Sequence, residues 1–193
     1  MKTRNISRAE MDERIARFGE LTTWAVQRNE RVPQAARDLI YARRLVAVAV
    51  PGAVEGPFNN PAAISGTDFS LTVAVCPPGQ GPGLHTHEKT TETFTCLTGR
   101  FRVYWGDEGE EETVLERLDT ISIPPGVVRG FQNVGDDEGM LQVLITGGVH
   151  DMNDIALVPA LARQLEQFGP DVLSEIEQTG LRFDAGVESD RED

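Results

Sequence analysis

The sequence is poor in the residues that bind metals and form cross-links, since its 193 residues include only three histidines and two cysteines. It also lacks a long hydrophobic run. The longest, Leu45 to Val50, is far shorter than the roughly 18 residues of a membrane span. The first 20 residues alternate charged and apolar side chains and do not contain the apolar core of a signal peptide. We therefore expect a cytoplasmic protein without a membrane partner.

Positive charge is scarce as well, with 18 Lys and Arg against 31 Asp and Glu and a formal net charge of −13. Such a chain repels phosphate backbones, and no basic cluster with interleaved aromatic residues reverses the repulsion locally. Nucleic acid is therefore excluded as an expected partner. Cys76 and Cys96 lie inside apolar alternating runs, where we expect free, buried thiols and no disulfide.

Most of the chain has the alternation of β-strands. From about residue 39, short runs with apolar side chains at every second position are separated by turns that contain Gly and Pro. The eight runs are "LVAVAV", "FSLTVAVC", "ETFTCLTG", "RFRVYWGDEGE", "ETVLERL", "DTISIPPG", "VVRGFQN" and "MLQVLITGG". Eight short strands at this spacing predict an all-β sandwich or barrel.

Helical signals are confined to the two ends of the chain. Ser7 and Glu10 form a capping-box pattern ahead of a short amphipathic helix, which we expect to pack on the body or on a second subunit. Near the C-terminus, one helix is predicted to start at Pro159 and a second at Pro170. We treat the chain as one domain, made of an N-terminal helix and arm (1–38), a barrel (39–150), C-terminal helices (151–180) and an acidic tail (181–193).

The stretch from Gly79 to Gly99 concentrates the candidate metal ligands. His85 and His87 are one residue apart, and residues i and i+2 of a strand point to the same face. Glu92 opens the next run after four residues, enough for a hairpin turn that returns its carboxylate over that face. Two imidazoles and one carboxylate, with other coordination positions open, form the ligand set of non-haem iron oxygenases.

A His-x-His pair alone is common on solvated strands, so the surrounding spacing matters. Here Gly79 is followed by five residues, His85, one residue, His87, four residues, Glu92, six residues and Gly99. This spacing resembles the first motif of the cupin superfamily. The resemblance implies a small antiparallel jelly-roll barrel with a metal inside its mouth, and it implies a homodimer.

The second cupin motif is matched in "LDTISIPPGVVRGFQN", with two departures. The matching positions are Asp119, Pro124, Gly126 and Asn133. Leu118 stands where the motif usually has Gly. Arg129 stands where the family has its fourth metal ligand, a histidine, so the resemblance implies a site with only three ligands. The remaining histidine, His150, follows the last predicted strand and is expected in a surface loop.

Arg129 changes the expected chemistry, because a guanidinium stays protonated and cannot ligate a metal. If the family geometry holds, the alternation of "VVRGFQN" turns Arg129 into the barrel, where a buried cation needs a partner. The partner is either Glu92, in a salt bridge that replaces the metal, or a substrate carboxylate or enolate beside the metal. We favour the metal, because two histidines and a glutamate are more than a salt bridge requires.

These features predict a metal-dependent enzyme that acts on a small anionic or carbonyl-containing organic substrate. His85, His87 and Glu92 are the expected ligands of one divalent transition metal per chain (Fe, Mn, Ni, Cu or Zn), and Arg129 is the expected catalytic residue. Open coordination positions favour a dioxygenase-type oxidoreductase. The alternatives are a non-redox isomerase or lyase, and a small-ligand-binding cupin without turnover.

Overall fold

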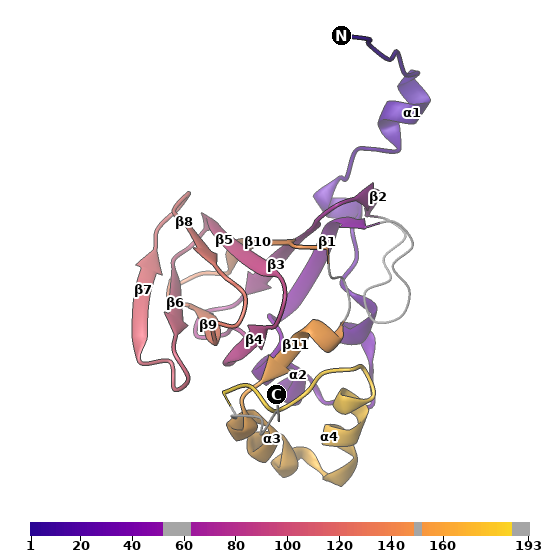
Figure 1. Cartoon of the computed structure of the whole chain (residues 1–193). Coiled ribbons are helices and arrows are strands. Elements are labelled where there is room, and N and C mark those ends of the chain that lie inside the picture. Colours follow the sequence, from indigo (N-terminus) through magenta and orange to yellow (C-terminus); the bar gives the residue numbers. More distant parts are fainter. Residues whose placement is uncertain (52–62, 149–151, 187–193) are drawn as a thin grey trace, which may run out of the picture.

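The chain folds into two β-sheets that face each other, with helices at one end of the barrel and an arm that extends away from it (Figure 1). The structure is a computed structural model, and it describes residues 1–51, 63–148 and 152–186. His150 and the end of the acidic tail, from residue 187, lie outside the described residues. The observed architecture confirms the all-β jelly-roll class with short helices towards both ends.

The larger sheet has six strands in the order β2-β1-β3-β10-β5-β8, all antiparallel to their neighbours except β1 and β2. Their bounds are β1 Arg44–Pro51, β2 Ile64–Thr67, β3 Ser70–Cys76, β5 Thr91–Thr98, β8 Thr120–Ile123 and β10 Gly139–Thr146. Five of these six strands were predicted from alternation, β2 being the exception. In β5 the alternation buries Glu92, Phe94 and Cys96 and leaves the residues between them partly exposed.

The smaller sheet has five strands in the order β11-β4-β9-β6-β7. Their bounds are β4 His85–His87, β6 Phe101–Trp105, β7 Glu111–Leu115, β9 Arg129–Asn133 and β11 Ile155–Leu157. The strand β4 is the predicted His-x-His strand, whereas β11 was not predicted. It lies past the last predicted strand and pairs with β4 along its whole length, Ile155 opposite His87 and Leu157 opposite His85.

The barrel interior is an apolar core with aromatic rings packed edge to face. Phe131 lies at the centre, with ring centroids 5.1 Å from Phe94 and 6.0 Å from Phe101, a geometry that aromatic quadrupoles favour. Cys76 and Cys96 are buried and free, as expected. Burial of these side chains is the main force that closes the two sheets on each other.

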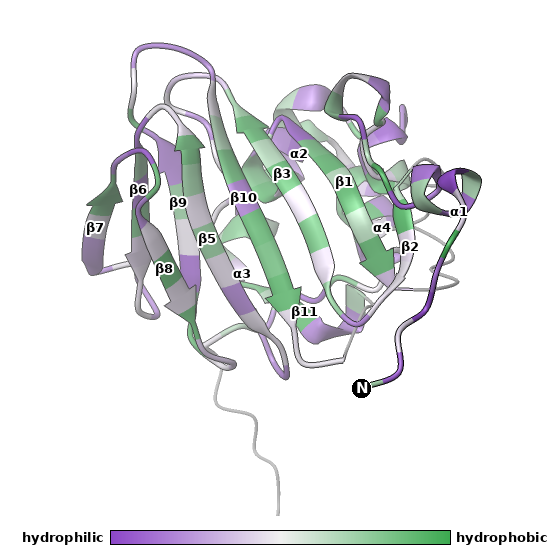
Figure 2. Cartoon of the chain, turned by 90° about the horizontal axis from the view of Figure 1, so that it is seen from above, coloured by the Kyte–Doolittle hydropathy of each residue, from purple (hydrophilic) through white to green (hydrophobic). Residues whose placement is uncertain are grey.

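The central strands of the larger sheet are apolar on both faces. Figure 2 shows long hydrophobic stretches side by side on β1, β3 and β10. On the face away from the barrel core, Val46, Val73 and Val75 are buried together, and Leu21 of the N-terminal segment packs against them. Burial on both faces explains why "LVAVAV" in β1 is apolar at every position and not only at alternate ones.

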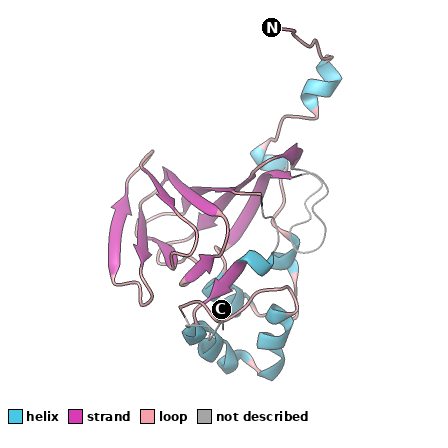
Figure 3. Cartoon of the chain, viewed as in Figure 1, coloured by secondary structure: helices cyan, strands magenta, loops and turns pink. Residues whose placement is uncertain are grey.

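Helices and 3₁₀ turns gather at one end of the barrel, where they cover part of its mouth (Figure 3). The α-helices there are α2 Gln34–Ile40, α3 Pro159–Leu165 and α4 Pro170–Glu177, with the 3₁₀ helices η2 Ala25–Arg28, η4 Met152–Asp154 and η5 Glu166–Phe168. The 3₁₀ helix η1 Phe18–Glu20 lies apart from them, on the N-terminal arm. Both C-terminal helices start at the predicted prolines. Their apolar faces form a cluster with Ile40 of α2 and Leu157 of β11. Within the described residues, no helix is long and apolar enough to cross a membrane.

The N-terminal helix α1 Arg8–Asp12 extends away from the barrel (Figure 1). The predicted capping box is present, with the Ser7 hydroxyl accepting from the Glu10 amide at 3.2 Å and the Glu10 carboxylate accepting from the Ser7 amide at 2.7 Å. The helix has five residues and none of them is buried, so it does not pack on the body of this chain, which was one of the two expected arrangements. Met11, Ile15 and Phe18 are 46%, 41% and 42% exposed, so the arm leaves its apolar side chains uncovered.

Candidate metal centre

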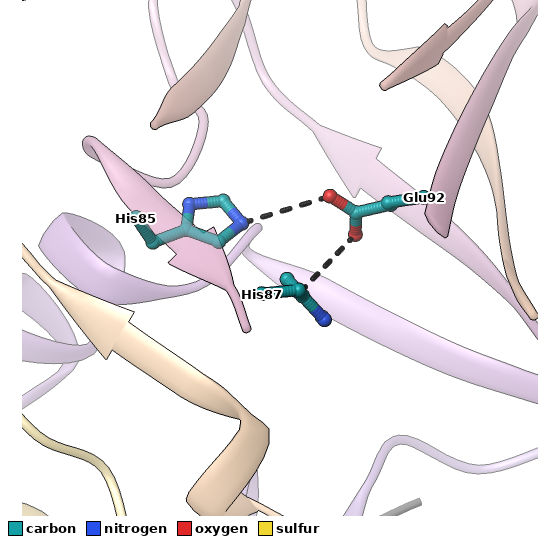
Figure 4. Close-up of side chains that lie close together, drawn as sticks. All are labelled: His85, His87 and Glu92. Carbon is teal, nitrogen blue, oxygen red and sulfur yellow. Dashed lines mark ion pairs between the residues drawn. The ribbon is translucent and has the colours of Figure 1, made fainter. Parts of the chain in front are cut away.

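The three predicted metal ligands converge inside the barrel. His85 and His87 come from β4, where they are the two inward positions of a three-residue strand, and Glu92 comes from β5 of the facing sheet. One ligand atom from each residue lies within 4.8 Å of the other two. Figure 4 shows both imidazoles directed at the carboxylate of Glu92.

The hydrogen bond of His85 fixes which of its ring nitrogens carries the hydrogen. Nδ1 lies 2.8 Å from the carbonyl oxygen of Gly83. Because a carbonyl only accepts, Nδ1 must donate, and the neutral ring then has its lone pair on Nε2. This Nε2 lies 3.8 Å from Oε2 of Glu92.

A second network fixes His87 in the same way. The Thr90 hydroxyl donates to Oδ2 of Asp154 at 2.5 Å, which leaves its oxygen to accept from Nδ1 of His87 at 2.9 Å. Nδ1 also lies 3.2 Å from the same Asp154 oxygen, and a carboxylate only accepts. His87 therefore also turns an Nε2 lone pair towards Glu92, whose Oε1 is 3.8 Å away.

This arrangement fits a bound cation. At 3.8 Å the two nitrogens are too far from the Glu92 oxygens for hydrogen bonds. Donor atoms bound to one tetrahedral metal at about 2.0–2.2 Å lie about 3.4 Å apart, close to the observed separations. Burial lowers the pKa of His87 and outweighs the opposing effect of the Glu92 charge, which favours the neutral, metal-binding form of the ring.

Arg129 contacts the third ligand from β9. Its Nε donates to Oε2 of Glu92 at 2.9 Å and its Nη2 lies 2.8 Å from the same oxygen. Burial by itself raises the pKa of Glu92, but the charge of the Arg129 guanidinium beside it holds that pKa well below the usual value. The carboxylate is therefore ionised, with Oε2 engaged by the guanidinium and Oε1 turned to His87.

The position of Arg129 bears on the two partners left open by the sequence. As predicted, its side chain points into the barrel, and it is fully buried at 0% exposure. It is the register partner of His85 on the neighbouring strand. Its observed partner is Glu92, and it is not among the described residues that line the cavity above the ligands. Contact between Arg129 and a substrate stays a prediction.

A cavity of about 110 Å³ opens over the two histidines and Glu92. Its walls are mostly apolar and come from the barrel, from the segment around Trp24 and from the C-terminal residues. The remaining described lining residues are Trp24, Val26, Ile40, Tyr41, Ala42, Leu45, Ser70, Thr72, Pro82, Phe131, Val143, Ile145, Met152, Ile155, Leu157 and Leu181. The three candidate metal ligands therefore form a polar corner at the side of an apolar chamber.

Asp154 and Thr90 were missed by the sequence analysis. Asp154 stands in "MNDIAL" ahead of a short strand, where an acidic residue reads as an ordinary turn residue, and it is 67 positions from His87. Thr90 is one of four residues assigned to a hairpin turn. The available signal was the sequence "HEKT", which places a hydroxyl three residues after a candidate ligand.

Residues 72–146 match the family model described as a cupin domain. Among solved structures, the chain is similar to a conserved protein with a double-stranded β-helix domain from Klebsiella pneumoniae. The identity is 26%, the match covers 42% of this chain and 69% of that one, and the TM-score is 0.39. No curated protein matches the sequence.

Two enzymes of known class are also among the similar structures. A DMSP lyase structure is 20% identical over 58% of this chain and 50% of its own, with a TM-score of 0.45. A sugar phosphate isomerase of the cupin superfamily from Silicibacter pomeroyi is 20% identical over 42% of this chain and 51% of its own, with a TM-score of 0.37. The matches span about half of each enzyme, and at such low TM-scores they carry no argument about activity.

Proposed function

Because residues 72–146 make this chain a member of the cupin superfamily, we propose that it is a metal-dependent oxidoreductase of the dioxygenase type. One observation carries the proposal: two imidazole nitrogens and a carboxylate oxygen converge within 4.8 Å beside an apolar cavity. This ligand set leaves coordination positions open for a substrate and a second small molecule. His85, His87 and Glu92 are the proposed ligands.

The proposed cofactor is one divalent transition metal per chain, with Fe, Mn, Ni, Cu and Zn as candidates. When bound, the metal supplies Lewis acidity, open coordination positions and, for a redox-active ion, electron transfer. The chain holds the two Nε2 lone pairs and Oε1 of Glu92 in place before any ion arrives. It also surrounds them with apolar walls that exclude water.

Arg129 enters this proposal through its charge. Its guanidinium balances the carboxylate of Glu92 at 2.8 Å, so a site holding a divalent ion keeps a positive charge even with the Asp154 carboxylate beside His87. Such a site attracts an anionic or polarised oxygen ligand, such as a carboxylate, an enolate or a carbonyl group. We therefore propose that the substrate is a small anionic or carbonyl-containing molecule, with Arg129 tuning the charge at the metal.

The cavity limits the rest of the substrate. An engineered cavity of about 150 Å³ holds benzene, and the cavity here is about 110 Å³. Its described lining carries no Lys or Arg, and its hydroxyl groups are those of Tyr41, Ser70 and Thr72. These features favour a compact apolar body, no larger than about one ring, joined to oxygen atoms that chelate the metal.

The described lining of the cavity offers no good general base besides the three proposed ligands, which favours redox chemistry over the reaction of an isomerase or lyase. Both of those reactions need a general base near the substrate. Among the described lining residues, Tyr41 is the one titratable side chain apart from the three ligands. Burial raises the pKa of Tyr41, so its hydroxyl stays protonated at neutral pH and is a poor base.

Metal content is the direct test. The metal-free protein is reconstituted in turn with each of the five metals, and bound metal per chain is measured by elemental analysis. We expect close to one ion per chain for the wild type, none for His85→Ala, and an unchanged value for the control His150→Ala. Less than about a tenth of an ion per chain for every metal would overturn the proposal.

Oxygen consumption tests the reaction class. The loaded protein is mixed with small β-diketones, vicinal diols and 2-oxo acids, and dissolved oxygen and products are followed together. Substrate-dependent oxygen uptake that His85→Ala abolishes supports the dioxygenase. Turnover without oxygen uptake would instead indicate an isomerase or lyase.

We also propose that the protein is a homodimer, with the N-terminal arm packing on the second copy. The arm leaves Met11, Ile15 and Phe18 exposed. Residues 1–20 carry five basic and four acidic side chains, whereas the whole chain has a net charge of −13. A segment with a small net positive charge and exposed apolar side chains complements an acidic body.

Deletion of residues 1–20 tests the dimer without damage to the core, because none of these residues is buried, whereas Trp24 and Val32 further along are. Light scattering at micromolar concentration should show a dimer for the intact chain and a monomer for the truncated one. A monomeric intact chain would remove this part of the proposal.

A further inference from the structure

A carboxylate outside the segment that matches the cupin domain contacts the metal centre. Asp154 is the last residue of η4, beyond the matched range of 72–146. It is only 4% exposed. Burial of a carboxylate costs free energy unless the group is hydrogen-bonded, so the hydrogen-bond partners of Asp154 indicate its role.

Asp154 accepts hydrogen bonds from three donors that flank the ligands. The Lys89 amide donates to Oδ1 at 2.7 Å, and the Thr90 hydroxyl donates to Oδ2 at 2.5 Å. Nδ1 of His87 lies 3.2 Å from Oδ2 and 2.9 Å from the Thr90 oxygen. Nδ1 of His87 is therefore linked to Asp154 in two ways, by the direct contact and by the hydrogen bonds through the Thr90 hydroxyl.

The backbone holds Asp154 in register with His87. The neighbouring residue, Ile155, is the pairing partner of His87 in the β4–β11 ladder. The Glu88 amide also donates to the Asp154 carbonyl at 2.9 Å. Backbone hydrogen bonds to β4 therefore fix the position of Asp154 relative to His87, and the contact of its carboxylate with His87 does not depend on an unpaired loop.

We propose that Asp154 is the positioning residue of the metal centre: it holds His87 as the Nδ1–H tautomer and aims Nε2 at the metal. The metal-binding part of this inference rests on the proposed function, whereas the tautomer can be observed without metal. Carboxylate partners of ligating histidines have this effect in metal sites generally, because they fix the ring and raise its basicity.

Asparagine is the informative replacement, because it keeps the shape and loses one acceptor. The Lys89 amide is fixed by the backbone, so the Asn oxygen must face it, and the Asn NH₂ group then faces Thr90 and His87. Two donors cannot pair, so Nδ1 of His87 becomes an acceptor and its hydrogen moves to Nε2. That hydrogen occupies the position the metal needs.

The tautomer is read by nitrogen NMR of the metal-free protein at about pH 8, above the ordinary histidine pKa of about 6.5. The chain has three histidines, so a His87→Ala sample assigns the signal. We expect Nδ1–H for His87 in the wild type and Nε2–H in Asp154→Asn. The control is Asp184→Asn, an exposed acidic residue in the same C-terminal region, and it should leave the tautomer unchanged.

Metal affinity is the second readout. Competition titration with Zn²⁺ and a chromophoric chelator should show 10–100-fold weaker binding for Asp154→Asn, the usual loss when an outer partner of a ligand is removed. Thr90→Val, which keeps the direct contact, should lose less. Asp184→Asn should match the wild type.

The two readouts separate the two proposals. A wild type that binds no metal but holds His87 as Nδ1–H contradicts the proposed function and supports the role of Asp154 in the tautomer. A wild type that binds metal while Asp154→Asn keeps both Nδ1–H and full affinity overturns the inference alone. If Asp154→Asn does not fold, the wild type still decides, because Nε2–H at His87 would overturn it.

Discussion

The barrel mouth and the N-terminal arm contain the same kind of ion pair in opposite surroundings. Arg129 and Glu92 lie 2.8 Å apart with side chains 0% and 6% exposed, whereas Arg8 and Asp12 lie 2.7 Å apart with side chains 82% and 49% exposed. The distances are nearly equal, so distance says little about what each pair contributes. Exposure to solvent sets the contribution of each pair, because water screens the exposed pair and is excluded from the buried one.

The two regions therefore have different tasks. An exposed pair contributes about 0–1 kcal/mol, and loss of one partner leaves a charge that water solvates. A buried pair gives little net stability relative to an apolar pair, but loss of one partner leaves a charge that nothing solvates. The buried pair therefore fixes the positions of its two side chains in the site, whereas the exposed pair adds only a weak contact to a short helix.

The largest expected effect comes from breaking the buried pair. Arg129→Met should lower the free energy of unfolding of the metal-free protein by about 3–5 kcal/mol, because Glu92 is left buried without a counter-charge. Added divalent metal should restore more stability to this variant than it adds to the wild type, because the ion replaces the missing cation. Urea denaturation with and without metal measures both effects.

The matched control for this change is Arg8→Ala, which breaks the exposed pair and should alter stability by less than about 1 kcal/mol. Equal losses for the two variants would mean that burial does not set the contribution of these pairs. An Arg129→Met protein with a normal stability and no response to metal would contradict the charge-balancing role of Arg129.

An intermediate effect is expected from pH. Arg129 holds the pKa of Glu92 below its ordinary value of 4.5. The ionised group therefore stabilises the fold above about pH 4.5, and this contribution is lost as the pH falls towards the folded pKa, by at most about 1.4 kcal/mol per pH unit. In Arg129→Met, burial instead raises the pKa, so stability should increase as the pH falls from 7 towards 5.

Because the chain has 31 Asp and Glu, the useful quantity is the difference between the two proteins. Metal-free wild type and Arg129→Met are unfolded in urea at several pH values, and the two free energies are subtracted. The difference should shrink on acidification, since the wild type loses stability in the range where the variant does not. A difference that is constant between pH 7 and 3 would contradict the linkage between Arg129 and Glu92.

The smallest expected effect concerns an exposed turn. Leu118 has φ of +73° and is 67% exposed, at the position where the sequence motif usually has Gly. The left-handed conformation costs an ordinary residue about 1–2 kcal/mol, partly offset because Gly is more flexible when unfolded. Leu118→Gly should therefore stabilise the protein by about 0.5–1 kcal/mol in thermal or urea unfolding.

Gly126 is the reciprocal control. It has φ of +80°, and an added Cβ would meet no atom within 4 Å, so Gly126→Ala introduces backbone strain alone. This variant should lose about 1 kcal/mol. Destabilisation by Leu118→Gly would show that the leucine side chain makes a contact that outweighs its strain.

The sequence predicted the strands that carry side-chain alternation and missed those too short to show it. The run around Phe94 was assigned correctly, because one face of the strand is buried and the other is partly exposed. The run around Phe131 was also assigned correctly, although in that strand Gly130 on the other face is buried too. The three residues Ile155–Leu157 are apolar without alternation, and three residues contain less than one period of a helix. The helix Gln34–Ile40, which buries Ala36 and Ile40, was missed because it is shorter than the window of about 11–18 residues in which a helical period shows.

The three candidate ligands could be singled out because their spacing is local, whereas their partners depend on the tertiary structure. His85, His87 and Glu92 fall within eight residues, and strand geometry turns the two histidines to one face. Glu92 reaches them from the facing sheet, because β4 and β5 belong to different sheets and do not form the predicted hairpin. The partner of Arg129 is 37 positions away, and the sequence left two candidates open. Alternation gave the direction of its side chain correctly, but only the packing of the two sheets brings Glu92 within reach.

The pairing of β11 with β4 has a consequence for the order in which the site is built. All three ligands have left the ribosome before Asp154 is synthesised, and Leu181, part of the cavity wall, follows later still. A nascent chain of about 150 residues thus already contains the three proposed metal ligands, but not the carboxylate proposed to set the His87 tautomer. Closure of the chamber is therefore a late event of biosynthesis, completed by residues that lie outside the part of the chain matching the cupin domain.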